Sequence, residues 1–231
     1  MTVKKKGTQI AIDGPVAAGK SSVAKGVAKK LGYVYIDTGA MYRAVALYME
    51  SMGVSWENES AVSENVSNAK IRLAKPVGKK DDGRPVSVYL GSEDVSWEIR
   101  NSHIAEGASV MGKYPKVRKE LVKQQQKMAQ GESVVMEGRD ICLRVLPKAE
   151  FKIFMTADVG KRVLRKWEYL KERGINLTKA QVKDDLTRRD EREMNRKIDP
   201  LKPVRGAWVL DTSGMNIDEV IDTICERVKS I

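Results

Sequence analysis

The sequence is poor in cysteine, histidine and aromatic residues, and it has no long apolar run. Its 231 residues include two cysteines and one histidine, and 6% are aromatic. Cys142 and Cys225 lack the paired spacing of a disulfide framework or a zinc site, so neither is expected and a reducing cytosol is the simplest compartment. No run approaches the roughly 18 apolar residues of a membrane helix, so no membrane partner is expected. His103 has no carboxylate or nucleophile partner in the sequence pattern and is interpreted as structural.

Acidic residues are the minority charge in this chain. There are 42 Lys and Arg against 31 Asp and Glu, which gives a formal charge of +11 and a pI near 9.5. An anionic partner, either a nucleotide or a nucleic acid, is therefore expected. The length allows one sizeable core with a smaller insert.

One short stretch fits the phosphate-binding pattern G-x-x-x-x-G-K-[ST] and adds a second hydroxyl. Residues 8–13 before it resemble a buried strand, and Val23, Val27 and Leu31 after it share one helical face. A loop between a strand and a helix directs backbone N–H groups and the positive end of the helix dipole at a phosphate. A nucleoside triphosphate is therefore predicted to bind the residues Gly14, Pro15, Val16, Ala17, Ala18, Gly19, Lys20, Ser21 and Ser22.

Two side chains of this loop carry specific chemistry. Lys20 supplies a positive charge for the β- and γ-phosphate oxygens, and Ser21 offers a hydroxyl ligand to Mg2+. The simpler alternative is a Gly-rich turn that serves only packing. The strand and the helix that the motif requires are both indicated, which favours the nucleotide site.

Strand and helix patterns alternate along the chain, which is typical of an α/β fold with a parallel sheet covered by helices on both faces. Five strands of a P-loop NTPase-type sheet are predicted, at residues 8–13, 33–36, 133–136, 151–155 and 207–210. Alternating patterns near residues 71–73 and 86–90 indicate a small β-containing insert. We expect a kinase-like core of residues 1–58 and 131–231, a nucleotide-binding insert of residues 59–130, and a helical lid at about 158–200.

Charged groups gather where the predicted strands end. Arg43 follows the second strand, on a helix that Thr38 is expected to cap, and the third strand ends in Glu137-Gly138-Arg139-Asp140. Two acids and a guanidinium at a strand end are costly to desolvate unless a ligand needs them. A solvated surface charge remains the alternative for Arg43.

The predicted lid is rich in arginine. Thr178 and Gln181 form a capping box that opens its second helix. The spacing predicts one helical face that carries Arg189, Arg192, Glu193 and Arg196. A solvated, salt-bridged helix surface is the common outcome for such a run, whereas the phosphate-binding loop favours an arginine lid over phosphates.

The acceptor of the γ-phosphoryl group is inferred from what the chain lacks and from its arginines. The sequence has no Asn-Lys-x-Asp guanine motif, and Val209-Leu210-Asp211 is only a weak match to a motor ATPase strand. No general base is evident. A phosphate monoester acceptor is largely dianionic at pH 7 and needs no base, but its charge must be neutralised.

Four runs in order closely resemble the bacterial cytidylate kinase family. They are Gly14 to Ser22, Asp37-Thr38-Gly39-Ala40-Met41-Tyr42-Arg43, Glu137-Gly138-Arg139-Asp140-Ile141, and Arg189-Asp190 through Arg196 to Pro200-Leu201. The resemblance covers nearly the whole chain. It implies a nucleoside monophosphate kinase that transfers the γ-phosphoryl group of ATP to CMP or dCMP. We also expect Mg2+ as a cofactor, a monomer in the cytoplasm, and no nucleic-acid partner.

The resemblance also implies roles for individual residues. Thr38, Arg43 and Arg139 resemble acceptor contacts, and Ser109, Arg118 and Asp140 resemble the cytosine pocket, in which a carboxylate faces the base's N4 amino group. Arg189 and Glu193 resemble ribose contacts, and Arg162, Arg165 and Arg196 resemble phosphate or lid arginines. The implied catalytic groups are Lys20, Arg139, Arg165 and Arg196.

This chain departs from the family pattern at two places. Cys142-Leu143-Arg144 stand where the family more often has Gly-Thr and an apolar residue, which leaves the shape of the loop after Asp140 open. Glu193 replaces the usual Asp, which leaves a longer ribose contact open. The alternatives to the resemblance are another small-molecule P-loop kinase and a non-enzymatic, nucleotide-dependent RNA-binding protein, against which the low aromatic content argues.

Overall fold

Five parallel strands form the central sheet, in the order β2-β6-β1-β7-β8. The computed structural model describes residues 7–230, so residues 1–6 of the predicted core segment lie outside the described residues. All four pairings in this sheet are parallel. The strands are β1 (Gln9–Asp13), β2 (Val34–Asp37), β6 (Val134–Gly138), β7 (Phe151–Thr156) and β8 (Trp208–Asp211). The predicted sheet is confirmed.

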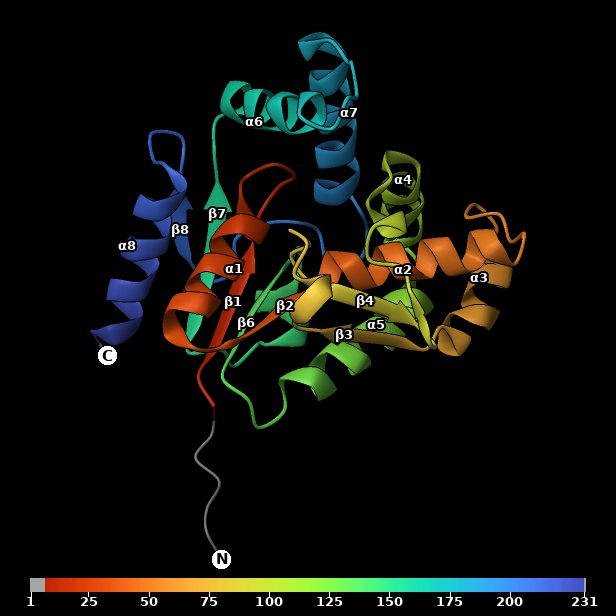
Figure 1. Ribbon diagram of the computed structural model, residues 1–231, viewed down its shortest axis with the longest axis horizontal. Helices are drawn as coiled ribbons and strands as arrows, with labels where there is room; N and C mark the ends of the chain where they lie inside the picture. Colours follow the sequence, from red (N-terminus) through yellow and green to blue (C-terminus); the bar gives the residue numbers. More distant parts are fainter. Residues whose placement is uncertain (1–6, 231) are drawn as a thin grey trace, which may run out of the picture.

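Helices cover both faces of this sheet (Figure 1). On one face, α1 (Lys20–Leu31) and α8 (Ile217–Lys229) pack on Ile10 and Ile12 of β1. On the other face, α5 (Pro115–Ala129) and the single π-helical turn η4 (Ile141–Val145) pack around Ala11. This division follows from the alternation of side chains along a strand, which sends Ile10 and Ile12 to one face and Ala11 to the other.

The predicted insert contains its own three-stranded antiparallel sheet, of β3 (Ile71–Ala74), β4 (Ser87–Leu90) and β5 (Glu93–Asp94). Val88 and Ile99 of this region pack on α2 (Thr38–Ser51). The short turns are η1 (Val66–Asn68), η2 (Gly78–Lys80) and η3 (Glu98–Arg100). The β-containing insert is thus confirmed.

A second apolar cluster joins α2 to α3 (Glu59–Asn65), α4 (Ser102–Met111) and α5. The predicted cap of α2 is wrong by one residue. Asp37, not Thr38, caps this helix, because its carboxylate accepts from the backbone N–H of Ala40 at 2.8 Å. Thr38 is the first helical residue, and its hydroxyl donates to the Glu137 carbonyl at 2.7 Å.

The lid consists of α6 (Val159–Lys171) and α7 (Lys179–Met194), which lie beyond the carboxyl ends of the strands (Figure 1). Leu170 of α6 and Leu186 of α7 are buried in one apolar cluster with Val16 of the phosphate-binding loop. The predicted capping box at Thr178 is present. The helix ends at Met194, however, so the prediction that Arg196 shares its face is wrong.

The remaining expectations concern the scarce residues. Cys142 and Cys225 are buried and free. His103 lies on the surface of α4, with Nε2 2.8 Å from Glu50 and its ring 4.5 Å from that of Trp56. The carboxylate partner was not evident from the sequence. These contacts join α4 to neighbouring segments, which agrees with a structural role. Within residues 7–230, no helix combines the length and the apolar character needed to cross a bilayer.

Candidate active site

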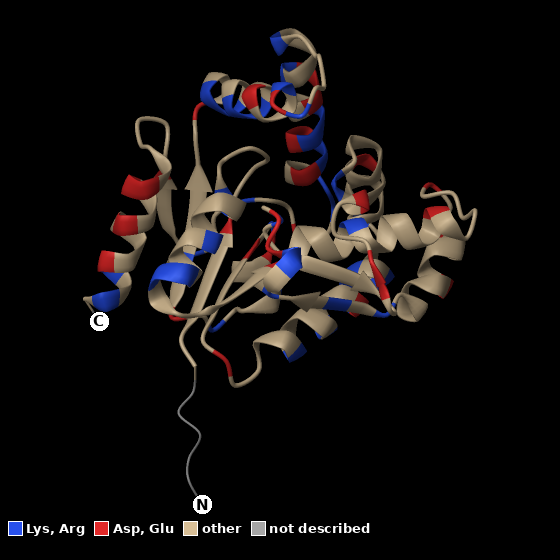
Figure 2. Ribbon diagram, in the orientation of Figure 1, with Lys and Arg blue, Asp and Glu red and all other residues tan. Residues whose placement is uncertain are grey.

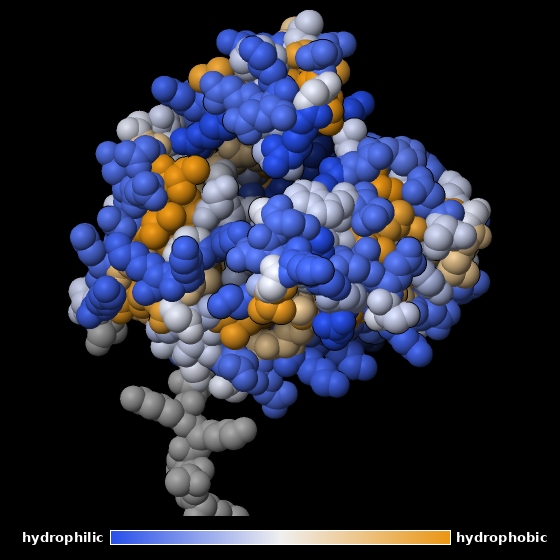
Figure 3. All heavy atoms as spheres, in the orientation of Figure 1, coloured by the Kyte–Doolittle hydropathy of each residue, from blue (hydrophilic) through white to orange (hydrophobic). Residues whose placement is uncertain are grey.

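A cavity of about 780 Å³ opens between the phosphate-binding loop, the ends of β2 and β6, and the lid. Of the described residues that line it, thirteen are Lys or Arg and six are Asp or Glu. Figure 2 shows basic residues on the lid side, and Figure 3 shows hydrophilic surface around a hollow beneath α6 and α7. Such an excess of positive charge in a concave site attracts a polyanion.

The phosphate-binding loop adopts the backbone that its glycines allow. Gly14 has φ 153°, and a Cβ there would stand 2.0 Å from the Met155 carbonyl oxygen, so only glycine fits. Gly19 at the start of α1 has φ 91°, in the left-handed region that favours glycine. The loop therefore passes close to β7 and turns directly into the helix N-terminus. The predicted residues from Val16 to Ser22 line the cavity, while Gly14 and Pro15 lie behind them.

Lys20 is buried at the centre of the site. Its Nζ donates to the Pro15 carbonyl at 2.7 Å. Burial, followed by the positive charge of Arg139, lowers the pKa of Lys20 to about 7, against the opposing influence of Glu137 and Glu193. A bound phosphate would reverse this balance, because a nearby anion favours the charged ammonium.

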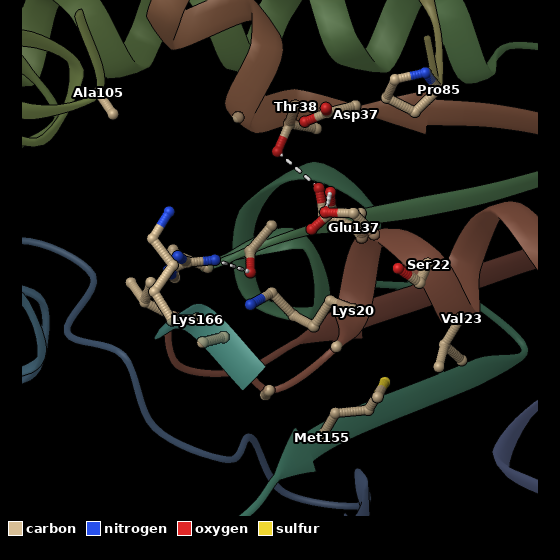
Figure 4. Close-up of a pocket in the computed structure, with 18 of the residues that line it drawn as sticks. Lys20, Ser22, Val23, Asp37, Thr38, Pro85, Ala105, Glu137, Met155 and Lys166 are labelled. Atoms are coloured by element: carbon tan, nitrogen blue, oxygen red, sulfur yellow. Dashed lines mark hydrogen bonds between the residues drawn. The ribbon is translucent and has the colours of Figure 1, made fainter. Parts of the chain in front are cut away.

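Two acids, Glu137 and Asp37, lie near each other where β6 and β2 end. Ser21 donates to Glu137 Oε1 at 2.7 Å, and burial, followed by the negative charge of Asp37, raises the pKa of Glu137. Figure 4 shows Asp37, Thr38 and Glu137 grouped on the side of the cavity that faces Lys20. Hydroxyl and carboxylate oxygens are the ligands that Mg2+ prefers, so this group fits the metal that accompanies a nucleotide. The sequence prediction assigned Ser21 to the metal and singled out Glu137 only as one of the acids at the end of the strand.

Four arginines around the cavity keep guanidinium N–H groups without an acceptor. Within the described part of the chain, the atoms are Arg43 Nε, Arg100 Nε and Nη2, Arg189 Nε, and Arg196 Nη2. An unmatched buried donor is costly, and native proteins rarely keep one without a reason. These four residues therefore line the cavity with hydrogen-bond donors that no described protein group satisfies.

Arg100 is the member of this group that sequence reasoning missed. It ends η3 of the insert and lies near Arg43 and Asp37, whose charges act on its pKa, although burial is the main cause that lowers it. The sequence around Arg100 matches no motif that would mark this arginine as part of a site. Only the packing of the insert against α2 brings it to the cavity.

The other predicted acceptor residues also converge here. Arg43 forms an ion pair with Asp37 at 3.0 Å, and Arg139 forms one with Glu193 at 2.5 Å. Burial disfavours the charged form of Glu193, but the guanidiniums of Arg139 and Arg189 outweigh it and lower its pKa. The sheet ends and the lid are thus joined by ion pairs that surround the cavity.

The predicted cytosine pocket lies at one end of the cavity. Arg118 and Asp140 form a buried ion pair, and Arg118 also donates to Asp199 at 2.9 Å. Ser109 lines the same end and accepts from Arg192 at 2.9 Å. Asp199 was not predicted, because it lies 81 residues from Arg118 in the chain.

The structure settles the shape of the loop after Asp140. Residues 141–145 form a π-helical turn, and the buried carboxylate of Asp13 accepts from the backbone N–H groups of Ile141 and Cys142, each at 2.8 Å. The side chain of Cys142 points into the core, with Sγ 3.5 Å from the Ala11 carbonyl. The backbone that follows Asp140 is therefore fixed to the end of β1 through the Asp13 carboxylate.

Two lid arginines contact the phosphate-binding loop in different ways. Arg165 lines the cavity and donates to the carbonyls of Ala18, at 3.4 Å, and Thr212, at 2.7 Å. Arg162 is outside the lining, because its side chain donates to the Val16 carbonyl at 3.1 Å and pairs with Asp190 at 2.7 Å. Arg162 thus joins α6 to the phosphate-binding loop and to α7, a position consistent with the lid role that was one of its two expected roles.

The fold and the cavity together define a P-loop kinase of the nucleoside monophosphate type. Its parallel sheet carries a phosphate-binding loop, an insert and an arginine lid around one cationic cavity. The chain belongs to the cytidylate kinase family, whose model matches residues 10–230.

Named relatives agree with this assignment. A cytidylate kinase of Streptococcus suis strain 05ZYH33 is 40% identical over 226 residues, which cover 98% of both chains. A cytidylate kinase of Caldanaerobacter subterraneus subsp. tengcongensis is 42% identical over 221 residues, which cover 96% of this chain and 94% of the relative. The crystal structure of an uncharacterized protein from Eubacterium ventriosum is similar with a TM-score of 0.55 at 14% identity, over 98% of this chain and 100% of that one, which supports the fold alone.

Proposed function

We propose that this protein transfers the γ-phosphoryl group of ATP to CMP, and also to dCMP, and releases CDP or dCDP and ADP. The observation that carries the proposal is that Arg43, Arg100, Arg189 and Arg196 line one cavity together with Lys20, and that each keeps a buried guanidinium donor without an acceptor. Two nucleotides brought end to end carry roughly six negative charges, and phosphoryl transfer depends on neutralising and aligning them.

The donor and acceptor nucleotides are assigned to opposite ends of the cavity. The triphosphate lies on the phosphate-binding loop with its base toward Met215 and Asn216, beside Arg165. The CMP base lies against Arg118, Asp140 and Ser109, with Thr38 near the acceptor. We assign residues 59–130 to monophosphate binding and residues 1–58 and 131–231 to the core, with the lid at about 158–200.

The chain's own groups account for the reaction without a general base. The acceptor phosphate has a second pKa near 6 and is already largely dianionic at pH 7. Lys20, Arg139, Arg165 and Arg196 neutralise and align the reacting phosphates, and the lid excludes the water that would hydrolyse ATP. Ser21 and Glu137 would hold Mg2+, which when bound stabilises charge on the phosphate oxygens. We propose that the protein acts as a cytoplasmic monomer.

A panel of acceptors tests this function. The purified protein is incubated with ATP, Mg2+ and CMP, dCMP, UMP, AMP or GMP, and ADP release is followed. CMP is expected to give the highest kcat/KM. Equal or greater turnover of UMP or AMP would overturn the assignment and favour another small-molecule kinase.

A further inference from the structure

Asp199 lies beyond the end of α7, in the segment that returns from the lid to the sheet. It is 8% exposed and has φ 51°, in the left-handed region that a non-glycine residue seldom occupies. Aspartate is one of the few residues that tolerate this conformation. A buried acid with this backbone indicates that the surrounding contacts hold it in place.

Asp199 binds three arginines at once. Its Oδ2 accepts from Arg118 Nη2 at 2.9 Å and from Nε at 3.3 Å, and its Oδ1 accepts from Arg144 Nε. Its backbone carbonyl accepts from Arg196 Nε at 2.6 Å. Burial disfavours the charged carboxylate, but the hydrogen bonds from Arg144 and Arg118 outweigh it and hold the pKa of Asp199 below its usual value.

These contacts determine which donors of Arg118 remain for a ligand. A guanidinium has five N–H groups. Asp199 and Asp140 engage the Nε group and both groups on Nη2, and the Gly112 carbonyl engages one group on Nη1 at 3.2 Å. One Nη1 donor is left among the described contacts. A single, oriented donor suits a base edge that presents one acceptor at that position.

The same residue orients Arg196. The Asp199 carbonyl holds Nε, and Nη2 stays buried without an acceptor in the described part of the chain. Arg118 is close enough that its charge, after burial, contributes most to lowering the pKa of Arg196. Asp199 therefore contacts both guanidiniums, that of Arg118 through its carboxylate and that of Arg196 through its backbone carbonyl.

Arg144 connects this cluster to the turn that follows Asp140. Its side chain is 56% exposed, whereas that of Asp199 is 7% exposed, so Arg144 reaches in from the surface. The pair ties the segment after the lid to η4 and thereby to Asp140. Arg144 is also one of the three residues after Asp140 at which this chain departs from the family pattern.

We propose that Asp199 is a positioning residue for the acceptor nucleotide. Asp199 orients Arg118 toward the base and Arg196 toward the phosphate, and its ion pair with Arg144 holds it in place. This inference rests on the proposed cytidylate kinase function. Asp199 contacts neither the phosphate-binding loop nor Arg165 among its described hydrogen bonds, so its effect is on CMP and not on ATP.

Steady-state kinetics of Asp199→Asn and Asp199→Ala test the proposal. The KM for CMP is expected to rise about tenfold or more, because a charge-assisted contact is lost, while the KM for ATP stays within about twofold. Asp184→Asn, a change at an exposed acid on α7, is the matched control and leaves both constants unchanged. If Asp199→Ala does not fold, Asp199→Asn preserves the side-chain volume and is compared alone.

A double-mutant cycle with Arg144→Ala separates a positioning role from a general loss of stability. Arg144→Ala alone is expected to raise the KM for CMP, and it adds nothing in the Asp199→Ala background. If the wild-type enzyme uses CMP and the Asp199 variants have the same KM for CMP, the positioning role is wrong. Fully additive effects of the Asp199 and Arg144 substitutions would also overturn it. Absence of CMP turnover in the wild type overturns the proposed function instead.

Discussion

Arg139 at the end of β6 donates its Nε to Glu193 of α7 over 2.5 Å, and this ion pair joins the sheet to the lid. Nη1 of Arg139 donates to the Gly138 carbonyl at 3.1 Å. The ion pair lies close to Lys20, because the charges of Arg139 and Glu193 both act on the pKa of Lys20. The lid is thus attached to the reacting centre through a charged pair and not only through apolar packing.

Loss of the Glu193 charge should weaken this attachment. For Glu193→Gln, we expect kcat/KM for CMP to fall about tenfold, because a charge-assisted hydrogen bond in a partly buried site is worth about 1.5–3 kcal/mol. Glu191→Gln changes an exposed acid on the same helix and serves as the control. Equal activity of the two variants would argue against the pair.

Lys20 should take up a proton when ATP binds. Burial lowers its pKa to about 7 in the free protein, so at pH 8 the neutral amine predominates, and bound phosphates raise the pKa again. Calorimetry of ATP binding at pH 8, in two buffers of different ionisation enthalpy, should therefore report a net uptake of protons.

Lys20→Met is the control for this uptake. The variant should bind ATP without a buffer-dependent heat and should lose at least about a hundredfold in kcat, as expected when a phosphate-directed donor is removed. Identical binding heats in both buffers for the wild type would contradict the account of Lys20.

The regular parts of this structure were predictable because they depend on local pattern. The strand at residues 9–13, the loop to Ser22 and the capping box at Thr178 are each encoded by spacing over a few residues. The resemblance to the family added Ser109, Arg118 and Asp140, which line the cavity as expected. The positive charge alone had also allowed a non-enzymatic RNA-binding protein, but the chain belongs to a kinase family.

What could not be predicted depends on tertiary contact. Arg162 and Arg165 are three residues apart on α6, yet one is neutralised by Asp190 outside the cavity and the other lines it. Helical periodicity placed Arg196 on α7, but the chain leaves the helix at Met194 and Asp199 then holds that arginine. Long-range pairing of charges has no signature in a single sequence.

Asp140 should determine the preference for cytosine. A carboxylate accepts from the N4 amino group of cytosine, whereas an amide can donate to the O4 of uracil. For Asp140→Asn, we expect the ratio of kcat/KM for CMP to that for UMP to fall about 10- to 100-fold, with the KM for ATP nearly unchanged. A ratio equal to that of the wild type would remove Asp140 from base recognition.

Asp13 should make stability depend on pH. Burial raises its pKa to about 6, against the backbone N–H groups of Cys142 and Ile141. Its pKa is therefore higher in the folded state than in the unfolded state, so the folded state binds more protons between about pH 4 and 6 and loses stability as the pH rises through that range. Above about pH 6, the carboxylate is charged in both states, and the full free-energy cost of burying it lowers the stability of the fold.

Urea unfolding of the wild type and Asp13→Asn from pH 4 to 7 measures this effect. The free energy of unfolding of the wild type, relative to that of the variant, should fall by at most about 3 kcal/mol as the pH rises. The variant also loses one acceptor for the N–H groups after Asp140, which shifts the difference by a constant. A difference that does not change with pH would contradict a raised pKa.

The central claim is that cationic side chains from the loop, the strand ends and the lid hold two nucleotides end to end in one cavity. A transfer assay with γ-labelled ATP, Mg2+ and CMP tests it most directly. We predict that the label is recovered in CDP, in equal amount to the ADP formed, and that Arg139→Met or Arg196→Met lowers this yield at least about a hundredfold. Recovery of the label in inorganic phosphate, or a yield of CDP unaffected by both substitutions, would contradict the claim.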